Sequence, residues 1–236
     1  MVEKITFEKK EKLDFRSREA YKSLRTNIQF CGSEVKVIAL TSCTPNEGKT
    51  SVSFYLAEAL AEGGNTVLFI DADMRKSVLA GRYGVGKIKG GLTEYLAGRK
   101  EQQKVIYQTD IEGMDIVFSG AIAPNPSELL GNDRFQKLIK EARENYDYVV
   151  VDTPPLGSVI DSAVISPMVD GVVMVIANNS VSYKFAQNIK QQLERSNARI
   201  LGVVLNKVPM TGKKYGKYYG YGKYYGKYYG NYQREE

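Results

Sequence analysis

The sequence contains no histidine and only two cysteines, Cys31 and Cys43. Without histidine, Ser-His-Asp and Cys-His catalysis are both excluded, and any metal ion must be held mainly by oxygen ligands. Two cysteines cannot build a disulfide framework or a zinc site with four cysteine or histidine ligands, and they favour a reducing compartment. The ligand types that remain favour Mg²⁺ over zinc.

Long apolar runs are also missing. No run approaches the roughly 18 residues that a membrane-spanning helix needs. The segment from Met1 to Lys12 is charged and lacks the hydrophobic stretch of a signal peptide. We therefore expect a cytoplasmic protein.

Strong net charge is absent from most of the chain. The formal net charge is +6, but residues 211–236 contribute +4 of it, so the first 210 residues are nearly neutral. The body therefore does not have the composition of a nucleic-acid-binding groove. A length of 236 residues, with 43% apolar and 25% charged residues, favours one main globular domain.

A phosphate-binding loop is predicted between residues 39 and 51. Gly48-Lys49-Thr50 follows an apolar strand pattern at 35–40 and precedes a helix pattern that continues over 52–61. Backbone N–H groups of such a loop hold phosphate oxygens, the lysine reaches the β- and γ-phosphates, and the hydroxyl binds Mg²⁺. Cys43 stands where the motif usually begins with glycine. The alternative is an ordinary strand-to-helix turn that carries a surface lysine.

Two more strand patterns end in carboxylates. The run 66–70 leads into Asp71-Ala72-Asp73, and the run 146–151 leads into Asp152, as in a Walker B element. Ligands of open parallel sheets bind beyond the carboxyl ends of the strands. Either aspartate cluster alone could be a simple turn, but three such strand ends together predict nucleotide binding.

Strand and helix patterns alternate along the rest of the chain. Further strands are expected at 115–118, 172–176 and 199–205, further helices at 17–28, 127–145 and 181–195, and a short helix at 92–97 inside a Gly-rich stretch, 79–113. This alternation predicts an α/β, P-loop NTPase-like fold with a mostly parallel sheet and helices on both faces. The expected organisation is an N-terminal arm (1–15), a P-loop domain (16–210) and a flexible tail (211–236).

The tail holds nine of the 17 tyrosines within 18 residues, mixed with lysine and glycine. Without aliphatic residues it cannot build a core, so it is expected to be disordered. It could be a linker, a binding segment for single-stranded nucleic acid, or a substrate with many phosphorylation sites. Beside an ATP site we favour the substrate, with these phosphorylation sites: Tyr215, Tyr218, Tyr219, Tyr221, Tyr224, Tyr225, Tyr228, Tyr229 and Tyr232.

The combined motifs resemble the bacterial tyrosine kinases of capsule and exopolysaccharide assembly, in their stand-alone cytoplasmic form. The resemblance rests on the P-loop, on the tyrosine cluster and on five stretches: 18–27, 69–75, 91–98, 126–130 and 151–155. It implies a P-loop kinase fold unrelated to eukaryotic kinases. It also implies ATP-dependent autophosphorylation of the tail between subunits, and regulation of polysaccharide synthesis.

The resemblance implies partners as well. Family members form a ring, typically an octamer, in which one subunit's tail enters the neighbouring active site. The interface motif is Glu, two residues, Arg, two residues, Arg; here Glu19, Lys22 and Arg25 match it with lysine at the middle position. By pattern alone these residues form only a solvated helix face. A separate transmembrane activator, which would hold the kinase at the inner face of the cell membrane, and a tyrosine phosphatase are also implied, and no nucleic acid is expected.

The cofactors implied are ATP and Mg²⁺. Lys49, Asp71, Asp73 and Asp152 are the expected catalytic residues, with Asp71 accepting the tyrosine proton, and Thr50, Asp73 and Asp152 are the expected metal ligands. Asn206 resembles the adenine-reading asparagine of related ATPases. The expected nucleotide-binding residues are Pro45, Asn46, Glu47, Gly48, Lys49, Thr50, Ser51 and Asn206. The alternative function is a partitioning or septum-positioning ATPase switch without kinase activity.

Overall fold

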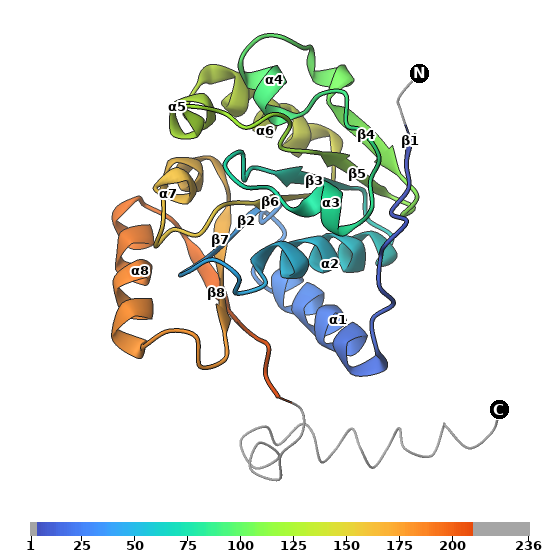
Figure 1. Ribbon diagram of the computed structural model, residues 1–236. Helices are drawn as coiled ribbons and strands as arrows, with labels where there is room; N and C mark the ends of the chain where they lie inside the picture. Colours follow the sequence, from blue (N-terminus) through green and yellow to red (C-terminus); the bar gives the residue numbers. More distant parts are fainter. Residues whose placement is uncertain (1–3, 210–236) are drawn as a thin grey trace, which may run out of the picture. The chain divides into compact units, whose positions relative to one another are not determined.

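The structure, a computed structural model, describes residues 4–209. In this part of the chain eight strands form one sheet in the order β1-β4-β5-β3-β6-β2-β7-β8 (Figure 1). All neighbouring strands are parallel except β4 and β5. The strands are β1 (Lys4–Ile5), β2 (Val37–Ser42), β3 (Val67–Asp71), β4 (Ile106–Thr109), β5 (Met114–Val117), β6 (Tyr148–Asp152), β7 (Gly171–Ala177) and β8 (Ile200–Asn206).

Helices cover both faces of the sheet (Figure 1). One face packs against α1 (Phe15–Gln29), α2 (Lys49–Glu62) and α3 (Leu79–Arg82). The other packs against α4 (Leu92–Leu96), α5 (Pro126–Leu130), α6 (Asp133–Asn145), α7 (Asp161–Ile165) and α8 (Tyr183–Arg195). Two 3-10 turns, η1 (Gln102–Lys104) and η2 (Ser166–Met168), complete the described elements. The predicted α/β fold with a mostly parallel sheet is confirmed.

Burial on both faces explains the unbroken apolar runs of the central strands. Along β2, Ile38 and Leu40 enter the core beneath α1 and α2, whereas Val37 and Ala39 enter the core on the opposite face. All six residues of β2 are buried. A strand covered by helices on both sides has no polar face, so its sequence does not alternate.

Strands β1 and β4 were not predicted, and they pair with each other at one edge of the sheet. Lys4–Ile5 lies in the segment expected as an arm. Phe7, just after it, is buried and packs edge-on against Phe54, with ring centroids 5.0 Å apart. The N-terminal segment therefore contributes both a strand and a core side chain.

The order of the sheet decides how the predicted motifs meet. Strand β6, which ends at Asp152, lies between β2, which leads into the P-loop, and β3, which ends at Asp71. The strands run parallel, so their carboxyl ends lie side by side. The three motif-bearing ends therefore come from adjacent strands.

The chain divides into a compact unit that runs to Asn206 and a second unit that begins at Lys207. The tail tyrosines, Tyr215, Tyr218, Tyr219, Tyr221, Tyr224, Tyr225, Tyr228, Tyr229 and Tyr232, lie outside the described residues. Among the helices of residues 4–209, none combines the length and the apolar character needed to span a bilayer.

Candidate active site

The P-loop joins β2 to α2 and contains two residues in the left-handed backbone region. Asn46 has φ of 65° and Gly48 has φ of 88°. Glycine adopts this conformation without steric cost, which accounts for Gly48 at the N-cap of α2. Cys43 is not among the described residues with positive φ, so its position tolerates a side chain. In the described part of the chain no side chain caps α2, and the N–H groups of its first turn suit an anion.

The buried side chain of Glu47 stabilises this loop through hydrogen bonds. Its buried carboxylate accepts hydrogen bonds from the Thr44 N–H at 2.8 Å, the Ala177 N–H at 3.2 Å and the Ser180 hydroxyl at 2.6 Å. The Asn206 side-chain amide donates to the Glu47 carbonyl at 2.9 Å. Glu47 and Asn206 thus tie the P-loop to the ends of β7 and β8. The adenine contact expected of Asn206 stays a prediction.

Lys49 and Asp152 form a buried ion pair, with 2.6 Å between Nζ and Oδ1. The Ser53 hydroxyl donates to the same Oδ1 at 2.9 Å, and Lys49 Nζ lies 3.3 Å from the Thr50 hydroxyl. Asp152 Oδ2 is buried and has no hydrogen-bond partner among the described residues. A buried carboxylate oxygen without a partner is costly, so it fits a site that holds a cation or its water ligands.

Asp71 lies directly beside Asp152, because the two residues are register partners on β3 and β6. Asp71 Oδ2 accepts a hydrogen bond from the Ser77 hydroxyl, and Oδ1 accepts one from the Asp73 N–H at 3.2 Å. Burial and the neighbouring Asp152 charge raise the pKa of Asp71 to about 7, although Ser77 and Lys49 oppose the shift. A carboxyl group with this pKa can take up or release a proton near neutral pH.

Asp73 organises the turn that follows β3. Its Oδ1 accepts hydrogen bonds from the N–H groups of Arg75 at 3.3 Å and Lys76 at 3.0 Å. Unlike Asp71, it is only partly buried. The described residues contain no cluster of three or more Asp, Glu, His or Cys side chains suited to a metal. A divalent cation here would therefore need phosphate oxygens, hydroxyls and water as further ligands.

Sequence reasoning missed several residues of the site. Ser53 lies one helical turn after Lys49, so helical spacing could have found it. Ser77 and Asp161 lie where the sequence shows no periodic pattern, and only the folded chain brings them to the motif residues. Ser51, predicted to bind nucleotide, accepts a hydrogen bond from Arg82 at 2.6 Å.

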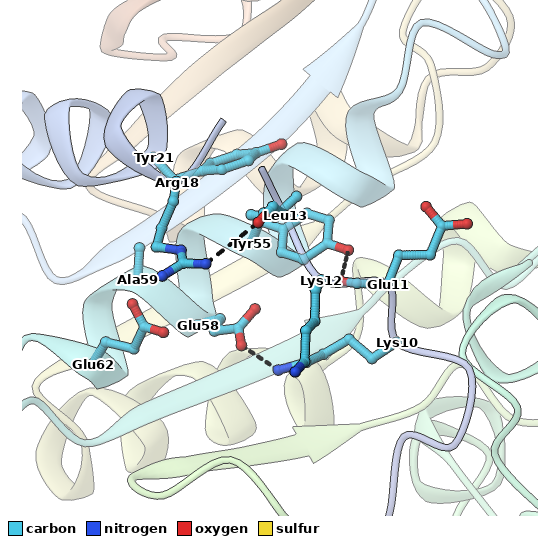
Figure 2. A pocket seen from close by; sticks show the side chains of 10 residues that line it. All are labelled: Lys10, Glu11, Lys12, Leu13, Arg18, Tyr21, Tyr55, Glu58, Ala59 and Glu62. Carbon is cyan, nitrogen blue, oxygen red and sulfur yellow. Dashed lines mark hydrogen bonds and ion pairs between the residues drawn. The ribbon is translucent and has the colours of Figure 1, made fainter. Parts of the chain in front are cut away.

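The predicted interface residues lie on α1. Lys22 pairs with Glu19 at 2.8 Å on the surface of that helix. Arg25 donates to the Ala59 carbonyl of α2 at 2.8 Å, so it holds two helices of the same chain together. A cavity of about 270 Å³ lies next to these helices; Figure 2 shows Tyr21, Tyr55 and the Lys10–Glu58 ion pair in its lining. Its lining includes Arg18 and Tyr21 of the 18–27 stretch, and none of the described residues of the P-loop and none of the three aspartates Asp71, Asp73 and Asp152 line it.

Comparisons with known proteins identify the family. A family model described as an AAA domain matches residues 35–201. The tyrosine-protein kinase CpsD of Streptococcus agalactiae is 41% identical over 194 residues, which cover 82% of this chain and 84% of that protein. The kinase domain of the Escherichia coli tyrosine kinase ETK superposes with a TM-score of 0.79 at 37% identity, covering 83% of this chain and 77% of that domain. The chain belongs to the bacterial tyrosine-kinase family. The resemblance noted from its motifs is confirmed, and its enzyme class is that of a protein-tyrosine kinase.

The fold is shared more widely than the family. The septum site-determining protein MinD from Pyrococcus horikoshii, solved with Mg-ADP, superposes with a TM-score of 0.62 at 24% identity over 72% of this chain and 70% of that chain. At this identity the likeness shows a common fold only. The alternative of a partitioning-type ATPase is therefore less supported than the kinase.

Proposed function

We propose that the chain transfers the γ-phosphoryl group of ATP to tyrosine residues, foremost those of its own tail in a neighbouring subunit. The observation that carries this proposal is that Lys49, at the start of α2, meets Asp152, which lies beside Asp71 at the ends of two adjacent strands. Phosphoryl transfer needs positioning and charge neutralisation more than covalent chemistry from the protein. A lysine, a phosphate-binding loop and paired carboxylates supply both.

Nucleotide binding would rearrange the Lys49–Asp152 pair. The loop N–H groups and the positive end of α2 would hold the phosphates, and Lys49 would turn to the β- and γ-phosphate oxygens. The Thr50 hydroxyl, Asp73 and Asp152 would hold Mg²⁺, directly or through water. Bound Mg²⁺ supplies positive charge that neutralises the transferring group. Asp152 Oδ2, which has no hydrogen-bond partner within residues 4–209, supports this assignment.

Asp71 is proposed to accept the tyrosine proton. The tyrosine oxygen forms a bond to the γ-phosphorus while the bond from that phosphorus to the β–γ bridging oxygen breaks and ADP leaves. The hydroxyl proton passes to the Asp71 carboxylate, whose pKa of about 7 suits a base near neutral pH. The Ser77 hydroxyl bonded to Asp71 Oδ2 must move aside to admit the substrate.

Incubation of the purified chain with MgATP and the activator's cytoplasmic peptide, followed by phosphopeptide mapping, tests this function. We expect phosphotyrosine in residues 213–232, because these tyrosines combine high density with lysine and glycine neighbours. The same chain truncated after Val208 is the control and should gain far less phosphate. ATP hydrolysis without any phosphotyrosine would instead support the ATPase switch.

A ring of identical subunits, typically an octamer in this family, is proposed to bring each tail to the next active site. Of the three residues that match the interface motif, Glu19 and Lys22 are the more available to a partner, because their side chains are 41% and 45% exposed. Arg25 is less available, since it is bonded to α2.

Replacing both Glu19 and Lys22 by alanine should lower the particle mass measured by light scattering, because the surface ion pair adds little to the fold itself. Exchange of the equally exposed pair Lys190 and Glu194 on α8 for alanine is the matched control. An unchanged mass for the α1 variant would remove these two residues from the interface.

The remaining assignments rest on the family. We propose that a separate transmembrane protein activates the kinase and holds it at the inner face of the cell membrane. A tyrosine phosphatase would reverse the modification, and the phosphorylation cycle would regulate capsular or exopolysaccharide synthesis. Coexpression with such an activator should raise the phosphotyrosine content of the chain.

A further inference from the structure

The turn that follows Asp73 is anchored to a distant part of the chain. Arg75 Nε donates to Asp161 Oδ2 at 2.8 Å and Nη2 donates to Oδ1 at 2.9 Å, a bidentate ion pair between residues 86 positions apart. The Ser127 hydroxyl donates to Asp161 Oδ1 at 2.6 Å and lies 3.1 Å from Arg75 Nη2. Asp161 is fully buried, so each of its oxygens depends on these donors.

The next residue, Ser162, reaches the other two motif strands. Its hydroxyl lies 2.9 Å from the Thr41 hydroxyl of β2 and 2.9 Å from the Thr153 hydroxyl that follows β6, and it donates to the Pro154 carbonyl at 2.6 Å. All of these groups are buried. The first two residues of α7 therefore contact the segments that carry the P-loop, Asp152 and Asp73.

We propose that Asp161 is a positioning residue for phosphoryl transfer, which acts through Arg75 to hold Asp73 and Asp71 in register with Asp152 and the P-loop. This inference rests on the proposed function, because it assigns the aspartates to Mg²⁺ and to the substrate proton. Arg75 is two residues from Asp73, and its N–H is bonded to the Asp73 carboxylate. Ser77, two residues further on, is bonded to Asp71.

The geometry favours a strong and specific contact. Bidentate Arg–carboxylate pairs restrict orientation as well as distance. Asp161 is fully buried, whereas the Arg75 side chain is 38% exposed. Asp161→Asn removes the carboxylate that holds the Arg75 guanidinium in this orientation, so the turn should shift. The P-loop itself would keep its own hydrogen bonds through Glu47. Loss of the Arg75–Asp161 pair should thus weaken Mg²⁺ binding and slow phosphoryl transfer more than it weakens phosphate binding.

The test measures binding of a fluorescent ATP analogue, with and without Mg²⁺, to the full chain and to Asp161→Asn. Without Mg²⁺ the affinity should stay within about twofold, whereas the gain in affinity on adding Mg²⁺ should shrink by about tenfold or more, as for lost outer-shell partners of metal ligands. The rate of tyrosine phosphorylation should fall by a similar factor. The double variant Asp161→Asn, Arg75→Ala should lose no more of the Mg²⁺-dependent gain in affinity than Arg75→Ala alone.

The chain offers a matched control in the Arg143–Asp170 pair. It is also bidentate, at 2.9 and 2.7 Å, but Asp170 accepts from the N–H groups of Lys36 and Val37 at the opposite end of β2. Asp170→Asn should lower the melting temperature and leave the Mg²⁺-dependent gain unchanged. The proposal would be overturned if Asp170→Asn reduced the Mg²⁺-dependent gain in affinity as much as Asp161→Asn does. It would also be overturned if Asp161→Asn kept the full wild-type gain in affinity.

Ser127→Ala keeps the proposal testable if Asp161→Asn does not fold. It removes one hydrogen bond to Asp161 and leaves the ion pair, so the Mg²⁺-dependent gain should fall by roughly two- to fivefold. An unchanged gain in this variant would count against the proposal. The binding measurement needs no kinase activity. A wild-type chain that makes no phosphotyrosine would contradict the proposed function, but the effect of Asp161 on Mg²⁺-dependent nucleotide binding could still be measured.

Discussion

Replacing Lys49 by methionine should lower tyrosine phosphorylation by at least about two orders of magnitude. Methionine keeps the length of the side chain but removes the charge that would neutralise the β- and γ-phosphates. Phosphotyrosine formation measured with labelled ATP provides the readout. Lys137→Met, on the exposed surface of α6, is the control and should retain full activity.

The same substitution leaves the buried Asp152 without its cation, so folding must be checked by circular dichroism. Lys49→Arg keeps the charge and changes only the reach and shape of the group. We expect it to fold and still to lose most activity, because a guanidinium cannot occupy the small space of an ammonium group in the loop.

Transfer between subunits is tested by mixing two chains, neither of which can phosphorylate a tail of its own. The Lys49→Met chain supplies a tail, and a chain truncated after Val208 supplies an intact active site. Phosphate should appear on the tail of the Lys49→Met chain. Its absence, when the wild-type chain is active under the same conditions, would show that each subunit phosphorylates its own tail.

Replacing Asp71 by asparagine should lower activity by about 10²- to 10⁴-fold, the range of general base catalysis, and should raise stability above neutral pH. The folded-state pKa of Asp71, about 7, lies above its ordinary value of 3.8. A carboxyl group of this kind is favourable to folding when protonated, and this contribution is lost as the pH rises through 7. Asparagine does not ionise, so the stability of the Asp71→Asn variant does not fall in this way as the pH rises.

Thermal melts at pH 5 and pH 8 would measure this effect. The melting temperature of Asp71→Asn should exceed that of the wild type by roughly 3 °C or more at pH 8, and by less at pH 5. Asp147 gives a control of opposite sign, because hydrogen bonds from Thr66 lower its pKa. Asp147→Asn should reduce stability at pH 8. A pH-independent shift for Asp71→Asn would contradict the burial argument.

Much of the fold was predictable because its signals are local. The central strands are unbroken apolar runs, and the helix after the P-loop ends at Gly63 and Gly64. The missed elements are short, and their stability comes from partners distant in sequence. Strand β1 has two residues and exists through its pairing with β4, while α7 has five residues and is held by Ser162 and Asp161.

By itself the sequence determined the family, the P-loop and the three carboxylates Asp71, Asp73 and Asp152. Each of these is recognised from residue types and their spacing within one short stretch of the chain. Tertiary structure alone decided that β6 lies between β2 and β3, and therefore that Asp71 faces Asp152. The pKa of Asp71, the engagement of Lys49 by Asp152 and the anchoring of Arg75 to Asp161 all follow from that order. The physical reason is that burial and pairing of charges depend on neighbours in space, which local sequence patterns do not specify.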